Sequence, residues 1–204
     1  MGEVAAAEII LRRNVPVGGE VEQRARHDLA GYYAHLEATD RAVGRLLAEI
    51  DLADAVVVFT SVHGDMHGSH GLFRKAWPHE ESIRVPLVIR APTAGGRPPL
   101  VTPGPDESPL SLVDLPHLAV AWAEGRPWHC RRDHAVISMP EPAAVPHQCD
   151  RAWRGFRTVR HKLVLNADGS PWLYFDLEAD PFEQANLAAD PARRREIADL
   201  AALV

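Results

Sequence analysis

The stretch Ala55-Val-Val-Val-Phe-Thr60 leads directly into the loop sequence Ser61-Val-His-Gly-Asp-Met-His-Gly-Ser-His-Gly-Leu-Phe-Arg-Lys75. A short, continuous, β-branched apolar run predicts a strand that is covered on both faces, as in a parallel α/β sheet. The glycine-rich polar sequence after it predicts a loop at the carboxyl end of that strand. Ligands collect at such strand ends in open α/β sheets, so this loop is the first candidate for a functional site. The sequence Arg84-Val-Pro-Leu-Val-Ile-Arg90 predicts a second buried strand.

The flanking patterns predict that these strands belong to an α/β portion over residues 1–125. Apolar residues at helical spacing predict one helix over residues 20–50 and another over residues 111–122. A proline- and glycine-rich segment over residues 91–109 predicts an irregular surface crossing between them.

From about residue 130 the pattern changes to short strands separated by turns. The expected strands cover residues 135–138, 156–159, 162–165 and 172–176. Such closely spaced strands predict a small antiparallel sheet. Asp190, followed by proline, is expected to cap a terminal helix. We therefore expect a second portion over residues 126–204, and an α/β fold class for the whole chain.

The composition is that of an ordinary globular protein, with 46% apolar and 25% charged residues. The formal net charge of −6 disfavours a nucleic-acid or anionic-membrane partner, because both favour a basic surface. No apolar run approaches the ~20 residues of a membrane-spanning helix, and no signal-peptide pattern is present. A cytoplasmic location is expected, with Cys130 and Cys149 as reduced thiols. The chain has only two lysines, Lys75 and Lys162.

The loop and its flanks resemble the sulfatases, a family of the alkaline-phosphatase-like superfamily. In that family a strand ends in Thr-Ser-Asp-His-Gly or Thr-Ser-Asp-Asn-Gly, and a glycine-rich loop, a lysine, Glu-Glu-Ser and Arg-Val-Pro-Leu follow. Here the same order is Thr60-Ser-Val-His-Gly64, Lys75, Glu80-Glu-Ser82 and Arg84-Val-Pro-Leu87. Further on, Leu173-Tyr-Phe-Asp-Leu-Glu-Ala-Asp-Pro-Phe-Glu-Gln-Ala-Asn-Leu187 resembles the family's C-terminal signature. The resemblance covers most of residues 30–190. It implies part of a sulfatase-like α/β/α sandwich, with a small C-terminal antiparallel sheet and a helix.

The resemblance implies roles for two residues of the loop. Lys75 matches the lysine that contacts the sulfate group of a sulfate ester substrate, where its positive charge stabilises the anion. His63 matches the Asn or His position in or beside the shell of a divalent cation, usually Ca²⁺. The preceding position carries a metal-binding aspartate in the family but is Val62 here, so Ca²⁺ binding is expected to be weak. Asp65 is not expected to replace that ligand.

The family's nucleophile is a hydrated formylglycine made from the Cys or Ser of a C/S-x-P-x-R motif. Cys130 is followed by Arg-Arg and Cys149 by Asp-Arg, and Ser138-Met-Pro-Glu-Pro142 lacks the arginine. The aspartate pair that opens sulfatases is also not found. The chain is therefore expected to be a C-terminal fragment of a sulfuric ester hydrolase, inactive by itself, whose partner is a missing N-terminal sulfatase segment.

Two other functions stay open at this stage. One is a phosphonate or phosphate ester hydrolase of the same superfamily, whose loop is similar. The other is a non-catalytic scaffold or binding protein derived from the fold, which Val62 favours.

Several residues near the loop are expected to have ordinary structural roles. His63, His67 and His70 are spaced as on a helix, but the intervening glycines oppose a helix, so a three-histidine zinc site is the weaker interpretation. Glu80 and Glu81 are expected to cap a helix or to pair with Arg84. The acidic residues expected to stabilise turns of the C-terminal sheet are Asp176, Asp180 and Glu183.

Overall fold

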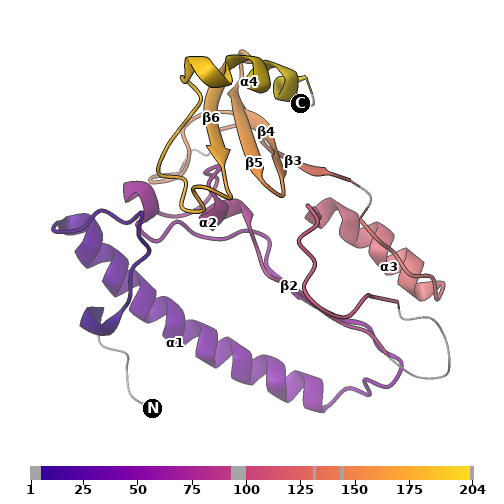
Figure 1. Cartoon of the computed structure of the whole chain (residues 1–204). Coiled ribbons are helices and arrows are strands. Elements are labelled where there is room, and N and C mark those ends of the chain that lie inside the picture. Colours follow the sequence, from indigo (N-terminus) through magenta and orange to yellow (C-terminus); the bar gives the residue numbers. More distant parts are fainter. Residues whose placement is uncertain (1–5, 93–99, 131, 143–144, 203–204) are drawn as a thin grey trace.

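The computed structural model of the chain describes residues 6–92, 100–130, 132–142 and 145–202. Figure 1 shows the C-terminal sheet with a short helix across one end, the long helix α1 (Glu20–Ala48) on the opposite side of the molecule, and α3 (Leu115–Ala123) to one side. The α-helices are α1 Glu20–Ala48, α2 Glu80–Ile83, α3 Leu115–Ala123 and α4 Arg194–Ala201. The strands are β1 Val57–Thr60, β2 Leu87–Arg90, β3 His134–Met139, β4 Trp153–Thr158, β5 His161–Asn166 and β6 Pro171–Asp176.

The C-terminal sheet has the order β3-β4-β5-β6, with every neighbouring pair antiparallel. This confirms the small antiparallel sheet that the sequence predicts. β5 and β6 are joined by a turn closed by the hydrogen bond from Gly169 N to Asn166 O, 2.9 Å, with Gly169 at a φ of 85°. Gly155 in β4 allows a close approach to β5, because a Cβ atom there would lie 2.1 Å from the Leu163 carbonyl oxygen.

The sheet has an apolar cluster on each face. On one face Phe156, Leu163 and Tyr174, all fully buried, pack with Ile197 of α4. The other face carries a cluster of Cys149, Trp153, Val164, Leu173, Phe175 and Leu177. α4 follows a short 3-10 turn, and Asp190 caps that turn by accepting a hydrogen bond from Ala192 N at 2.9 Å, as expected.

The strands β1 and β2 differ from the prediction. They pair with each other in antiparallel orientation, so the predicted parallel arrangement is wrong for these residues. They are also not covered on both faces: Val58, Phe59 and Val88 are 38%, 47% and 61% exposed. An apolar run shows that a strand favours burial, but it does not show which way its neighbour runs.

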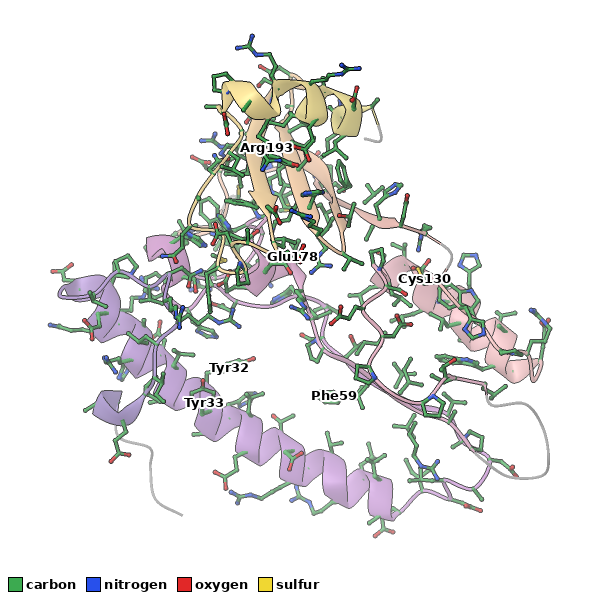
Figure 2. The ribbon with its side chains drawn as sticks, viewed as in Figure 1. Tyr32, Tyr33, Phe59, Cys130, Glu178 and Arg193 are labelled. Atoms are coloured by element: carbon green, nitrogen blue, oxygen red, sulfur yellow. The ribbon has the colours of Figure 1, made fainter. Side chains whose placement is uncertain are left out.

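The long helix α1 confirms the helix expected over residues 20–50, but the apolar residues of its stripe are exposed or only partly buried. Ala25 is its buried residue, in a cluster with Val15 and Phe73. Tyr32 and Tyr33 are 42% and 45% exposed, and Figure 2 labels them on α1. The helix is thus attached to the rest of the protein through its N-terminal half.

Other expectations are met in part. α3 begins at Leu115, with proline tolerated in its first turn, and covers most of the helix expected over 111–122. Part of the irregular crossing, residues 93–99, lies outside the described residues. Among the described residues, no helix is long and apolar enough to cross a membrane. The division of the chain at residue 125 stays a prediction.

We expect the isolated chain to self-associate, because exposed apolar strands pair readily with other chains. Light scattering should show species larger than the monomer. Phe59→Lys and Val88→Lys should each reduce them, whereas Val159→Lys, at a position 52% exposed between β4 and β5, should not. A monodisperse wild-type monomer with a sharp, cooperative melt would show that the described residues close their own core.

Candidate functional site

The loop after β1 is held against α2 by its backbone. Gly64 N donates to Ser82 O at 2.8 Å. A Cβ atom at Gly64 would lie 1.9 Å from the Glu81 carbonyl oxygen, so only glycine fits at this position. The contact fixes the end of the loop that carries His63.

The loop brings His63 and Lys75 together across 12 residues of sequence. Lys75 Nζ lies 2.9 Å from His63 Nε2, and His63 Nδ1 lies 2.8 Å from the Gly64 carbonyl oxygen. A carbonyl oxygen only accepts, so Nδ1 carries the proton. The lone pair of Nε2 is then free to accept from the lysine ammonium. His63 thus orients Lys75 without adding a second positive charge.

The backbone on both sides of Lys75 is strained. Arg74 and Ala76 have φ values of 63° and 74°, a region that residues with a side chain rarely occupy. Hydrogen bonds hold this conformation: Met66 N donates to Arg74 O at 2.9 Å, and Trp153 Nε1 donates to Ala76 O at 3.0 Å. Strain that the surrounding structure maintains is a frequent property of functional loops.

The residues expected in a metal shell do not suit Ca²⁺. Val62 is 82% exposed and offers no donor atom. Asp65 Oδ1 accepts from His67 N at 3.0 Å, which closes its own loop turn. His63 supplies a nitrogen already bonded to Lys75. Ca²⁺ prefers six to eight oxygen ligands, so these residues do not form a calcium site by themselves.

The three histidines of the loop have separate surroundings. His63 contacts Lys75, His67 packs on the Tyr32 ring at 4.6 Å between centroids, and His70 stacks on His79 at 4.1 Å. The described residues therefore do not bring the three together as one zinc site.

Below the loop lies a buried network of charged residues that sequence reasoning missed. The side chain of Lys162, on β5, is fully buried and contacts the carboxylates of Glu183 and Glu80. Arg157 Nη2 also lies 3.2 Å from Glu80 Oε2. The sequence predicts that Glu80 caps a helix or pairs with Arg84. In the structure Glu80 lies in the first turn of α2 and pairs with the C-terminal sheet instead of Arg84. Glu183 is buried instead of stabilising a surface turn.

Glu81, which follows Glu80 in α2, binds the segment before α1. Asn14 Nδ2 donates to Glu81 Oε1 at 2.9 Å and to the Phe182 carbonyl oxygen at 3.1 Å. Arg12 Nη1 lies 3.4 Å from the same Glu81 oxygen. α2 thus joins the N-terminal segment and the C-terminal sheet, and the loop is attached to both.

The buried network keeps Glu183 ionised. Burial of the carboxyl group favours its neutral form, but the hydrogen bond from His79 and the charge of Lys162 outweigh this and lower its pKa to about 2. At the sheet edge, the hydrogen bond from Arg160 likewise holds the pKa of Asp176 at about 2. Asp176 Oδ1 also accepts from Glu178 N at 3.2 Å, which confirms Asp176 as a turn residue at the end of β6.

The two cysteines are unpaired, as expected. Burial raises the pKa of the Cys149 thiol. A thiol with a raised pKa is a poor nucleophile at neutral pH, so Cys149 acts as a core residue.

Comparison with known proteins places these features in a family. The Sulfatase family model matches residues 12–125. The ulvan-active sulfatase of Formosa agariphila is 31% identical over 200 residues, covering 87% of this chain and 38% of its own length. The choline-sulfatase of Rhizobium meliloti is 32% identical over 190 residues, covering 83% of this chain and 35% of its own.

The fold agrees with this assignment. The crystal structure of the yidJ protein from Bacteroides fragilis, described as a sulfatase, superposes with a TM-score of 0.74 at 23% identity. The matched region covers 93% of this chain and 44% of the yidJ protein. The chain therefore spans less than half the length of the relatives it matches. On the family match and these similarities, the chain belongs to the sulfatase family of the alkaline phosphatase superfamily.

Proposed function

We propose that this chain supplies the sulfate-binding lysine of an arylsulfatase-type sulfuric ester hydrolase, with Lys75 as that residue and His63 as the group that positions it. The observation that carries the proposal is the 2.9 Å contact between Lys75 Nζ and His63 Nε2 on a strained loop. The match of the Sulfatase family model to residues 12–125, which include both residues, adds support.

The chemistry follows from the charge of the substrate. A sulfate ester carries a negative charge on its non-bridging oxygens, and an ammonium group stabilises that charge. An ammonium has three N–H donors, and the bond to His63 uses one of them. The others are directed by that bond and can bind two substrate oxygens. In this pair His63 accepts from the ammonium, so the positive charge offered to the substrate is that of Lys75.

We propose that these 204 residues bind the sulfate ester but do not hydrolyse it. No cysteine or serine here lies in a C/S-x-P-x-R sequence. The Sγ atom of Cys130 faces backbone carbonyl oxygens, those of Pro109 and Arg132, each at 3.9 Å. Neither contact is with a base that could activate the thiol.

The first test concerns turnover and binding. The isolated chain should hydrolyse p-nitrophenyl sulfate no faster than its Lys75→Met variant. Wild-type protein should still bind the ester, measured by NMR shift titration, and Lys75→Met should weaken binding about tenfold, as expected for loss of one charge-assisted contact. Arg74→Met, next to Lys75, is the matched control and should bind normally.

Two results would contradict this proposal. Turnover above the Lys75→Met level would show that a nucleophile exists in the chain. Equal binding by wild type and Lys75→Met would remove Lys75 from the site. A phosphonate monoester in the same titration tests the alternative substrate class, which tighter binding of that ester would favour.

The second test concerns the metal. Because Val62 replaces an oxygen ligand with a hydrocarbon, calorimetric titration with Ca²⁺ should show no micromolar site. A one-to-one micromolar isotherm that tightens in Val62→Asp would show that other residues complete a shell around position 62.

We also propose a partner for the exposed face of β1 and β2, namely an N-terminal sulfatase segment carrying C/S-x-P-x-R. The exposed Val58, Phe59 and Val88 support it, since an apolar strand surface of this kind usually marks an interface. Co-expression with such a segment should shift the light-scattering profile of the chain to a single heteromeric species. Unchanged self-association would oppose this partner without affecting the role of Lys75.

A further inference from the structure

Three side chains from distant parts of the sequence meet beneath the loop. They are His70 in the loop, His79 at the start of α2 and Glu183 after β6. Each offers one ligand atom, and these atoms all lie within 4.8 Å of one another. Among the described residues, this is the one group of three His, Cys, Asp or Glu side chains with such spacing. It is separate from the His63–Lys75 pair.

The cluster is held from several sides. Its imidazole rings stack at 4.1 Å with an interplanar angle of 20°. Glu183 Oε2 lies 3.2 Å from His79 Nδ1 and accepts from Glu80 N at 2.9 Å. Asn14 Nδ2 donates to His70 Nε2 at 3.0 Å, and a metal that binds Nε2 takes the place of this hydrogen bond. The contact of His79 Nδ1 with a carboxylate is of the kind that orients a histidine ligand of a metal site.

The backbone of the cluster is strained at two of its three members. His70 and Glu183 both have a φ of 56° although neither is glycine. A backbone hydrogen bond from His70 N to Asn14 O, 2.8 Å, holds His70 in this strained conformation. Maintained strain at converging polar side chains is typical of binding sites.

The charges around the cluster limit which cation it can take. Three carboxylates, those of Glu80, Glu81 and Glu183, face three cationic side chains, those of Lys162, Arg157 and Arg12. The surroundings are therefore close to neutral, and a dication adds positive charge near the Lys162 ammonium. A cation that binds by charge alone is disfavoured, whereas one that forms strong bonds to imidazole nitrogen is not.

The donor set of the cluster agrees with the ligand chemistry of zinc. Two histidines and one glutamate are a donor set that suits Zn²⁺, with a fourth position open.

We infer that His70, His79 and Glu183 form a binding site for a transition-metal dication of the Zn²⁺ type, which joins the loop, α2 and the C-terminal sheet. The metal draws the two histidine-bearing segments toward Glu183. This inference does not depend on the proposed role of Lys75.

The test uses the full chain and Zn²⁺ itself. Calorimetry should give one-to-one binding, and Co²⁺ in the same site should give visible absorption bands of a four-coordinate complex. His79→Gln and His70→Asn should each weaken Zn²⁺ binding tenfold or more. His67→Gln, in the same loop but outside the cluster, is the matched control and should bind like the wild type. Thermal melts with and without Zn²⁺ should show a stabilisation that the His79→Gln variant loses.

Because either histidine variant could unfold, a measurement on the wild type accompanies them. In NMR spectra of the imidazole nitrogens, Zn²⁺ should shift the signals of His70 and His79 and leave the signals of His134 unchanged. The inference is overturned if those two signals do not move at saturating Zn²⁺, or if folded His79→Gln binds Zn²⁺ as tightly as the wild type.

Discussion

The ammonium group of Lys162 is the feature on which the rest of this structure depends. Its side chain is fully buried, and the buried apolar residues 163–165 follow it on the same strand. A charge removed from water costs several kcal/mol unless partners compensate it. Glu80 from α2 and Glu183 from the loop after β6 are those partners. Three segments that are distant in sequence therefore have to meet at one point.

The arrangement of the site follows from that meeting point. α2 is fixed at its first turn by Glu80, and its Ser82 carbonyl oxygen binds Gly64. The loop therefore has a buried side that faces the ion network and an exposed side that carries His63. Lys75 lies between two strained residues that the sheet residue Trp153 helps to hold. The anion-binding role proposed for Lys75 thus depends on residues that never contact the anion.

Local features of the fold could be predicted from the sequence, and distant contacts could not. The helix α1, the strands of the C-terminal sheet and the cap at Asp190 depend on spacing and residue type within a few positions. The antiparallel pairing of β1 with β2 depends on chain direction, which an apolar run does not encode. The exposure of α1 could not be predicted either, because amphipathic spacing shows which face of a helix is apolar, not whether anything covers it.

The site shows the same division. Lys75 and His63 lie in one continuous motif, so the sequence singles them out, and the structure places them in contact; their roles in binding stay a proposal. His79, Glu183 and Lys162 were missed as a network because their contacts span 21 to 104 residues of sequence. One signal was available: Lys162 is one of two lysines and lies within an apolar strand sequence. A lysine at such a position requires a buried acidic partner.

The most direct test of this account is amide hydrogen exchange in Lys162→Met, a change that removes the charge but keeps a long side chain. If the Lys162 network holds the loop, the amides of Gly64 and Met66 should exchange at least about tenfold faster than in the wild type, a loss of about 1.4 kcal/mol of local stability. The amides between β5 and β6 should stay protected, which shows that the sheet is intact. Unchanged protection at Gly64 and Met66, in a variant with an intact sheet, would contradict the claim that Lys162 holds the loop in place.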